Sequence, residues 1–318
     1  MIFGSRRRGC DEETAARIVH RYLDAGGTVI DTADVYPGSE EICGRAVRDR
    51  RDAVVLSTKF GLPAGAGPNE RGAGRVRIRA ACEASLRRLN TDRIDVYWLH
   101  IDDIATPLEE TLSALHDLIR AGKVLYLGLS NLRAHRVMKA IGIADRLGGP
   151  PPVAYQGDYN LIVRGLEREH FPMFADEGLG FMSWSPLAGG MLTGKIQRDN
   201  TTEPTRLNQR ISATDAMHKN DHGFAVTGLV QKHAAEMGCS PAQLALAWQR
   251  TRAVASVILG ARTLDQLDDN LAALHVTIPP AILENLNDAT APPPEYPGAF
   301  ISISERWLQR SPSGEAGV

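Results

Sequence analysis

The hydrophobic residues of this chain fall into two alternating patterns. Short runs rich in β-branched residues, such as 54–59 and 94–100, are typical of buried strands. Between them lie longer segments, such as 11–25, in which apolar residues recur at helical spacing. Strands that alternate with helices in this way predict a parallel sheet covered by helices.

Seven strand–helix units can be counted from the strand that ends at Asp31 onward. Eight units close a (β/α)8 barrel, so the pattern predicts this single-domain α/β fold with one unit incomplete. Met1-Ile2-Phe3 is a candidate for the end of the first strand, and we expect the barrel to cover residues 1–290 and a poorly ordered, Pro-rich tail to cover 291–318. The predicted strands are 29–31, 54–59, 94–100, 124–130, 153–156, 180–185 and 255–259, and 186–221 is predicted to be a long loop.

Three predicted helices begin with the pattern of a capping box. In this motif a Ser or Thr side chain accepts a hydrogen bond from the backbone three residues later, and a Glu or Gln there reaches back to the first residue. We therefore expect reciprocal hydrogen bonds at three helix starts. The pairs are Thr106 with Glu109, Ser240 with Gln243, and Thr263 with Gln266.

Composition narrows the class of protein. The 318 residues carry a net charge of −2, so no basic excess favours nucleic acid or an anionic membrane surface as a partner. We find no apolar segment long enough to cross a membrane and no signal-peptide pattern. The four cysteines are scattered without CxxC spacing, which favours reduced thiols in a cytoplasmic protein. The sequence leaves the oligomeric state open.

Four reactive side chains follow three consecutive predicted strands. Asp31 ends the first strand, and Tyr36 lies in the loop after it. Lys59 ends the second strand, and His100 ends the third. Because the C-terminal ends of the strands form the active face of a parallel barrel, we expect these side chains to converge there.

Together these groups can donate a proton to a carbonyl. A phenol is a poor acid at neutral pH, and a nearby ammonium makes it a stronger one. Lys59 is suited to act in this way on Tyr36, while Asp31 would keep Lys59 charged and His100 would orient the carbonyl oxygen. Each residue alone has an ordinary structural explanation as a turn, packing or solvated group. Their succession on three strand ends favours the chemical explanation.

Other chemistries have weaker support. His218 and His222 are four residues apart, but in a predicted irregular loop, which does not favour a zinc site. Residues 189–195 look like a phosphate loop, but Ile196 stands where the motif requires Ser or Thr. No GxGxxG follows a strand, so a Rossmann site is not predicted. A lyase that uses Lys59 as a Schiff base is a weaker enzymatic alternative.

Several stretches, in order along nearly the whole chain, resemble the aldo-keto reductases, which are NADP-dependent (β/α)8-barrel enzymes. The likeness is closest to the branch with potassium-channel β subunits and bacterial general reductases. It implies Tyr36 as general acid, Lys59 as the cation that strengthens this acid, Asp31 as the partner of Lys59, and His100 as the residue that orients the carbonyl. The matching stretches are 30–36, 57–61, 98–100, 128–131, 184–187, 192–195 and 260–263.

The same resemblance implies an NADPH site. Arg262 beside the N-terminus of the predicted helix 264–274 suits a 2′-phosphate, so NADPH is expected over NADH, although Ala261 offers no side-chain donor. Trp184 matches the position of an aromatic ring that stacks on the nicotinamide. The other matching positions are Ser130, Asn131 and Gln156 at the carboxamide, Ser185, Leu187, Gly189 and Lys195 at the pyrophosphate, and Gly260, Gln266 and Asn270 at the adenosine end.

One departure from the family pattern concerns the start of the chain. Relatives usually begin with a capping hairpin and a full first strand, of which Met1-Ile2-Phe3-Gly4 is the matching part, so we expect a truncated first strand. The leading prediction is an NADPH-dependent reductase of small aldehydes or ketones. An NADPH-binding regulatory or sensor subunit with little turnover, or a truncated inactive homologue, is the alternative. Phe60, Trp98 and Trp307 are candidate apolar residues of the substrate pocket, with a place in the core as the equal alternative for Trp98.

Overall fold

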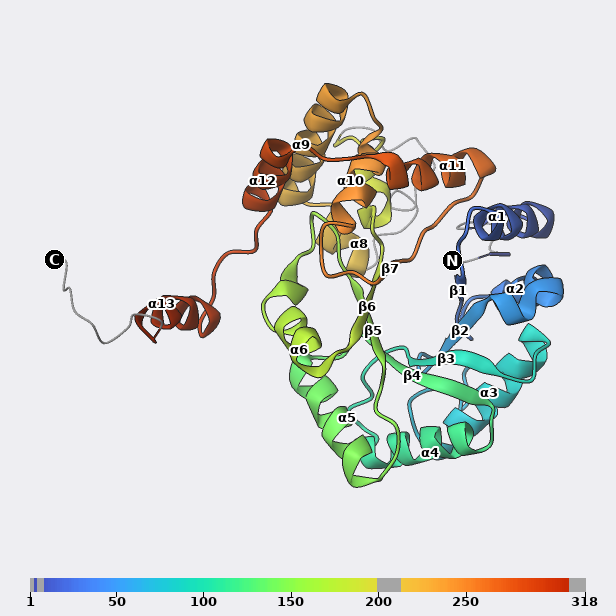
Figure 1. Ribbon diagram of the computed structural model, residues 1–318. Coiled ribbons are helices and arrows are strands. Elements are labelled where there is room, and N and C mark those ends of the chain that lie inside the picture. The colour runs from blue at the N-terminus through green and yellow to red at the C-terminus, as the bar shows by residue number, and fades with distance from the viewer. Residues whose placement is uncertain (1–2, 5–8, 199–212, 309–318) are drawn as a thin grey trace.

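Seven parallel strands form one continuous sheet at the centre of the protein (Figure 1). The computed structural model describes residues 3–4, 9–198 and 213–308. Each strand pairs with the next in chain order, with Asp31 opposite Ser57 and Lys59 opposite Trp98. This confirms the predicted barrel-type α/β fold. The strands are β1 (Val29–Asp31), β2 (Val55–Phe60), β3 (Ile94–Leu99), β4 (Val124–Ser130), β5 (Ala154–Asp158), β6 (Gly180–Trp184) and β7 (Ser256–Val257).

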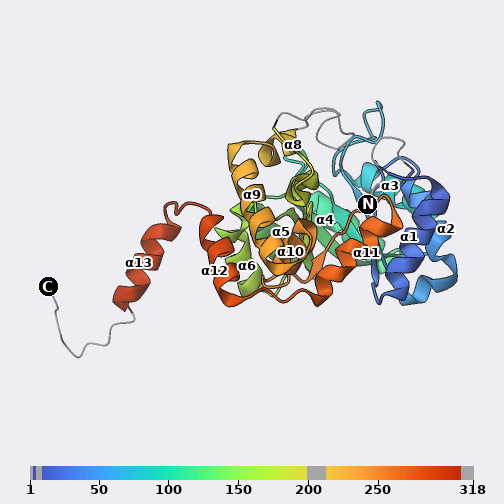
Figure 2. The ribbon, with the colours of Figure 1, turned by 90° about the horizontal axis from the view of Figure 1, so that it is seen from above.

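Helices surround the sheet and bury their apolar faces against its outer side (Figures 1 and 2). The first helix shows why the predicted periodicity works, because Ala15, Ile18 and Val19 recur at helical spacing and are all buried. The helices are α1 (Glu12–Asp24), α2 (Ser39–Val47), α3 (Arg75–Leu89), α4 (Leu108–Arg120), α5 (Ala134–Arg146), α6 (His170–Glu177), α8 (Ala213–His218), α9 (Asp221–Met237), α10 (Pro241–Gln249), α11 (Leu264–Ala272), α12 (Pro280–Ala289) and α13 (Gly298–Leu308), with 3₁₀ turns η1 (Arg48–Ala53), η2 (Gly165–Glu167), η3 (Ala188–Thr193) and η4 (Ala273–His275).

The outer edges of β1 and β7 face one another across a seam in the sheet. Within the described residues no strand pairs with either edge, so the sheet is an open curl. Helices α1 and α11 close the seam from outside, where Arg21 Nε lies 2.9 Å from Asp268 Oδ1. A solvent-open cleft lined mostly by apolar side chains remains between the two strand edges. Phe3 is buried at this cleft in a turn, while Met1 and Ile2 lie outside the described residues.

Two segments that we predicted to be irregular contain helices. The loop prediction for 186–221 is wrong in part, because η3 and α8 lie within it. The tail beyond 291 contains α13, which stands away from the barrel in both views (Figures 1 and 2). The proline cluster at 292–297 precedes this helix, and the Pro297 carbonyl accepts a hydrogen bond from the Ile301 N–H in its first turn.

Two of the predicted capping boxes can be compared directly. Ser240 Oγ accepts from the Gln243 N–H at 3.1 Å, and Gln243 Oε1 accepts from the Ser240 N–H at 3.2 Å, so this box forms as predicted. Thr263 Oγ1 accepts from the Gln266 N–H at 3.2 Å. Gln266 Oε1, however, accepts from the Arg262 N–H at 2.8 Å, so the reciprocal half of this box is displaced by one residue.

The third predicted box does not form. Helix α4 has Pro107 as its N-cap and no side-chain capping bond. Thr106 Oγ1 instead donates to Asp103 Oδ2 at 2.6 Å, and the same carboxylate accepts from the Ala73 and Ala105 N–H groups. The Thr106 hydroxyl would have to accept from the Glu109 N–H in a capping box, whereas here it donates to a carboxylate in the preceding loop and the helix starts one residue later.

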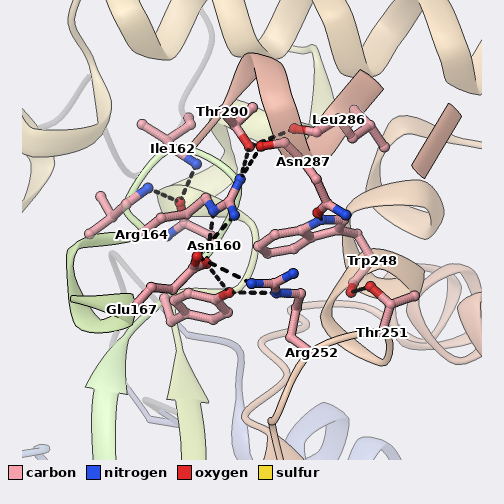
Figure 3. A network of polar contacts seen from close by, with 12 residues as sticks. Asn160, Ile162, Arg164, Glu167, Trp248, Thr251, Arg252, Leu286, Asn287 and Thr290 are labelled. Atoms are coloured by element: carbon pink, nitrogen blue, oxygen red, sulfur yellow. Dashed lines mark hydrogen bonds and ion pairs between the residues drawn. The ribbon is translucent and has the colours of Figure 1, made fainter. Parts of the chain in front are cut away.

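A buried polar network fastens α12 to the segment after β5 (Figure 3). Arg164 Nη1 donates to the Asn287 carbonyl and to Thr290 Oγ1, each at 2.7 Å. The same guanidinium is held by Glu167 at 2.8 and 2.9 Å. Trp248 Nε1 of α10 donates to Asn287 Oδ1 at 2.9 Å. Because these groups satisfy one another, we attribute a structural role to the network.

Candidate active site

The four side chains singled out in the sequence lie together at the C-terminal ends of β1 to β3. Lys59 Nζ donates to the Asp31 carboxylate and to the Thr32 carbonyl, the latter at 2.7 Å. The Tyr36 ring stands edge-on to His100, with ring centroids 6.0 Å apart and planes at 84°. Lys59 Nζ is 5.6 Å from the centroid of the Tyr36 ring. The structure therefore brings a phenol, an ammonium, a carboxylate and an imidazole into one cluster.

Strand alternation explains how the ammonium comes to be inside. Successive residues of β2 point to opposite faces of the sheet. Thr58 faces the helices, where its hydroxyl donates to Glu40 Oε1 at 2.6 Å, so Lys59 points into the curl. Its side chain is only 2 % exposed. A charge buried to this extent requires partners, and Asp31 is the one that neutralises it.

Further hydrogen bonds hold the Asp31 carboxylate. Ser57 Oγ donates to Oδ1 at 2.6 Å, and Gln156 Nε2 of β5 reaches the same oxygen at 3.3 Å. Burial alone would raise the pKa of Asp31, but the Lys59 ammonium and the Ser57 hydroxyl outweigh it and lower the pKa. Asp31 is thus ionised at neutral pH and keeps its charge directed at Lys59. The sequence analysis missed Ser57, although its position two residues before Lys59 places it on the same face of β2.

His100 is neutral at physiological pH in this environment. Burial, together with the nearby Lys59 charge, lowers the pKa of the imidazole to about 4. Its Nδ1 is buried and has no hydrogen-bond partner among the described residues. A neutral imidazole can offer one donor and one acceptor, depending on its tautomer. Such a group suits the orientation of a polar substrate atom better than the transfer of a charge.

The residues matched to a nicotinamide lie beside this cluster. Asn131 follows β4 with φ 60°, and its Nδ2 donates to the His100 carbonyl and to Ser130 Oγ, each at 2.9 Å. Gln156 is buried on β5. Trp184 ends β6 and is half-buried, and its Nε1 is buried with no hydrogen-bond partner among the described residues. The side chains of Ser130, Asn131, Gln156 and Trp184 thus come from three neighbouring strands, β4, β5 and β6, or the residue just after one of them.

The loop after β6 has an unusual backbone. Ser185, Ala188, Gly189 and Gly190 all have positive φ values, at 52°, 50°, 65° and 106°. Backbone in such conformations can turn its N–H groups to one side and form a concave site for an anion. Leu187 is half-buried in this loop, and Lys195 is exposed at its end. The N–H groups of Ala188 and Gly190 already donate within this turn, to the Ser185 and Leu187 carbonyls.

The residues matched to the adenosine end gather at the start of α11, which follows β7. Asn270 is buried, and its Nδ2 donates to the Gly260 carbonyl at 3.3 Å. Gln266 anchors the Arg262 backbone, which leaves the Arg262 side chain exposed next to the helix N-terminus. A guanidinium and a helix N-terminus both favour a phosphate.

Two of the predicted substrate-pocket residues are core residues instead. Phe60 is completely buried and packs against Tyr97 with ring centroids 4.7 Å apart. Trp98 is also completely buried, directly beneath Gly128. Their apolar character reflects packing and does not mark an exposed pocket wall. The side chain of Trp307 lies outside the described residues.

A family model described as the aldo/keto reductase family matches residues 1–290. The chain is a member of this family. It is 35 % identical over 307 residues to a probable voltage-gated potassium channel subunit beta of Arabidopsis thaliana, with 91 % of each chain covered. It is 36 % identical over 305 residues to the uncharacterised oxidoreductase YrpG of Bacillus subtilis, with 91 % of each chain covered. An aryl-alcohol dehydrogenase [NADP(+)] of Phanerodontia chrysosporium is 30 % identical over 293 residues, covering 87 % of this chain and 76 % of that protein.

Membership of this family indicates the class of reaction in which the cluster can take part. Aldo/keto reductases are (β/α)8-barrel oxidoreductases that act on small carbonyl compounds with a nicotinamide cofactor. The resemblance seen in the sequence is thereby confirmed. None of the helices in the described part of this aldo/keto reductase is both long and apolar enough to cross a membrane.

Proposed function

We propose that this aldo/keto reductase is an NADPH-dependent oxidoreductase that reduces an aldehyde or ketone to an alcohol. The observation that carries the proposal is the buried pair of Lys59 and Asp31 beside Tyr36, with the neutral His100 across from the Tyr36 ring. These groups supply an acid, a charge that strengthens it and an orienting group. NADPH, when bound, would supply the hydride.

Tyr36 is the proton donor in this proposal. As the carbonyl carbon accepts the hydride, the carbonyl oxygen takes the proton of the Tyr36 hydroxyl. The nearby Lys59 ammonium stabilises the phenolate that remains, and Asp31 keeps that ammonium charged and directed. General acid catalysis of this kind contributes about 10²–10⁴-fold to the rate. The reverse sequence oxidises an alcohol.

His100 orients the substrate. Because its pKa is lowered to about 4, the imidazole stays neutral over the physiological range. It can thus donate one hydrogen bond to the carbonyl oxygen without competing as an acid with Tyr36. Substrate placement of this kind accounts for much of the remaining rate, because it holds reacting groups in contact.

The proposed cofactor residues fit a dinucleotide on grounds of their own chemistry. Trp184 offers a half-buried ring next to the cluster, and Ser130, Asn131 and Gln156 offer polar atoms for a carboxamide. The positive-φ loop that contains Ser185, Leu187 and Gly189 suits a pyrophosphate, with Lys195 at its end. Gly260, Gln266 and Asn270 shape the site at α11, and the exposed Arg262 supports NADPH over NADH. The NADP(+) in the name of the fungal relative agrees with this preference.

The second candidate is an NADPH-binding regulatory or sensor subunit with little turnover. The similarity to the Arabidopsis thaliana protein, which is named as a potassium channel subunit, supports it. The two candidates share the cofactor site and differ in turnover. Because the acid, its cation and the orienting imidazole are all present, we favour the enzyme.

Cofactor binding and turnover test the proposal in turn. Titration of the purified chain with NADPH, followed by tryptophan fluorescence and by ligand-induced thermal shift, should give saturable binding that is weaker for NADH. A panel of aldehydes and ketones should then be reduced as NADPH is consumed. Binding without turnover would favour the sensor, and a folded protein that does not bind NADPH would refute both candidates.

A further inference from the structure

We propose that the buried ion pair between Asp34 and Arg77 is the element that positions Tyr36 beside Lys59. Asp34 lies in the same loop as Tyr36, and Arg77 lies in the first turn of α3. The Arg77 guanidinium donates to Asp34 Oδ2. The inference rests on the proposed role of Tyr36 and assigns positioning residues to it.

Tyr36 depends on its backbone for its place. Among the described residues its hydroxyl has no hydrogen-bond partner, and its ring makes an edge contact with His100. Its N–H donates to the Ala33 carbonyl at 3.0 Å, and its own carbonyl accepts from the Ser39 N–H at 3.0 Å. The first bond lies within the loop, the second joins the loop to the first residue of α2, and neither ties it to the sheet. The location of the phenol is therefore set by whatever fixes the loop.

Three further contacts fix this loop to its surroundings. Thr32 and Asp34 donate their N–H groups to the carbonyls of Ser57 and Lys59, at 3.0 and 3.1 Å, which joins the first half of the loop to β2. The side chain of Asp34 then connects the loop to α3 through Arg77. This ion pair is thus the side-chain contact that joins the loop to α3, two residues before Tyr36.

The burial of this ion pair argues against a role that is purely stabilising. The Asp34 and Arg77 side chains are 2 % and 10 % exposed, and Asp34 Oδ1 and Arg77 Nε are buried with no hydrogen-bond partner among the described residues. Burial raises the pKa of Asp34 to about 6, although the Arg77 charge acts in the opposite direction. A buried ion pair whose desolvation outweighs its attraction contributes little to stability.

Other charged groups in the same layer are already paired. Glu40 of α2 lies near Asp34 and also raises its pKa, while Arg88 of α3 lowers it. Arg88 Nε donates to Glu40 Oε2 at 2.6 Å, and the Thr58 hydroxyl satisfies the other oxygen. Arg77 is therefore the cation matched to Asp34, and replacement of either residue should release the loop.

The test uses the full chain with 3-fluorotyrosine at position 36, which reports on Tyr36 whether or not the protein turns over. Asp34→Asn keeps the shape of the side chain and removes its charge. We expect its ¹⁹F resonance to shift or broaden and kcat to fall about tenfold or more, because a misplacement of about 1 Å can cost about 10²-fold. The affinity for NADPH should stay within about twofold, since the hydrogen bonds and the ion pair of Asp34 involve no residue of the proposed cofactor site.

Asp95→Asn is the matched control. Asp95 pairs with Arg51 at 2.7 Å and has a similarly buried side chain, but it lies near the N-terminal end of β3, away from Tyr36. This variant should lower Tm while it leaves kcat and the ¹⁹F resonance at the wild-type values. A kcat loss in Asp34→Asn no larger than in Asp95→Asn would assign Asp34 a merely structural role and overturn the proposal.

A second variant covers the case in which Asp34→Asn does not fold. Arg77→Lys keeps the charge but loses the planar fork, so the same change of resonance should appear to a smaller extent. A wild-type resonance in a folded Asp34→Asn or Arg77→Lys variant overturns the inference. If the wild-type protein reduces no carbonyl, the proposed function fails, and the resonance still decides whether the pair positions Tyr36.

Discussion

Lys59 and Asp31 form an ion pair inside the curl of the sheet, with side chains only 2 % and 6 % exposed. Two buried charges repay their desolvation only when further hydrogen bonds satisfy them. Here the Thr32 carbonyl accepts from Lys59, and the Ser57 hydroxyl donates to Asp31. The pair is therefore held in one arrangement before any substrate arrives.

Removal of one partner should destabilise the fold more than removal of both. Lys59→Met leaves the Asp31 carboxylate buried without its cation, and we expect the free energy of unfolding to fall by about 3–5 kcal/mol. The double variant Lys59→Met with Asp31→Asn should recover most of this loss. Urea denaturation measures all three proteins, and equal losses in the single and double variants would contradict the coupling.

The imidazole of His100 predicts a pH dependence of stability. Its pKa is about 4 in the folded protein, below the ordinary value of 6.5, so the unfolded chain binds an additional proton between these values. The contribution of the neutral His100 to the free energy of unfolding is thus fully present above pH 6.5. It falls by about 3 kcal/mol as the pH drops toward 4. In His100→Gln this part of the pH profile should disappear. Parallel profiles for the two proteins would show that the imidazole is not desolvated.

Gly128 should tolerate no side chain. A Cβ at this position would lie 2.1 Å from the Trp98 ring. Gly128→Ala should therefore destabilise the protein by about 1–3 kcal/mol through overpacking. Gly142→Ala in α5 is the control, because its nearest neighbour would be 4.0 Å away, and alanine should add about 0.5–1 kcal/mol there. Thermal unfolding that ranks the two variants in the reverse order would contradict this packing.

Arg262 should discriminate between the two nicotinamide cofactors. Its guanidinium is exposed at the N-terminus of α11, where a 2′-phosphate would be bound by charge and by hydrogen bonds. Arg262→Gln should weaken NADPH binding by about tenfold or more and leave NADH binding unchanged. Fluorescence titration with each cofactor measures this, and an equal loss for both would place Arg262 away from the phosphate.

The sequence could predict which residues of the candidate site lie at the ends of strands. The apolar runs before Lys59 and His100 are long enough to mark β2 and β3, and strand geometry then places the two residues at one end of the sheet. The hydrogen bonds around them were not predicted, because they depend on contacts such as Gln156 with Asp31, which are 125 residues apart.

Competition between partners explains the local errors. The motif at Thr106 is compatible with a capping box, but the Thr106 hydroxyl donates to the Asp103 carboxylate instead. The apolar character of Trp98 left a pocket wall and the core as alternatives, and Gly128 on the next strand decides for the core because it leaves space for the ring there. In both cases the deciding group comes from outside the motif, so the motif alone could not predict the outcome.

The most direct test of the account compares the wild-type protein with Tyr36→Phe. Both should bind NADPH with equal affinity by fluorescence titration, since the substitution removes only a hydroxyl. With a reactive aldehyde such as 4-nitrobenzaldehyde, the loss of NADPH absorbance should be slower in Tyr36→Phe by about 10²–10⁴-fold, the usual contribution of a general acid. Equal rates in the two proteins would show that Tyr36 does not donate the proton and would contradict the proposed mechanism.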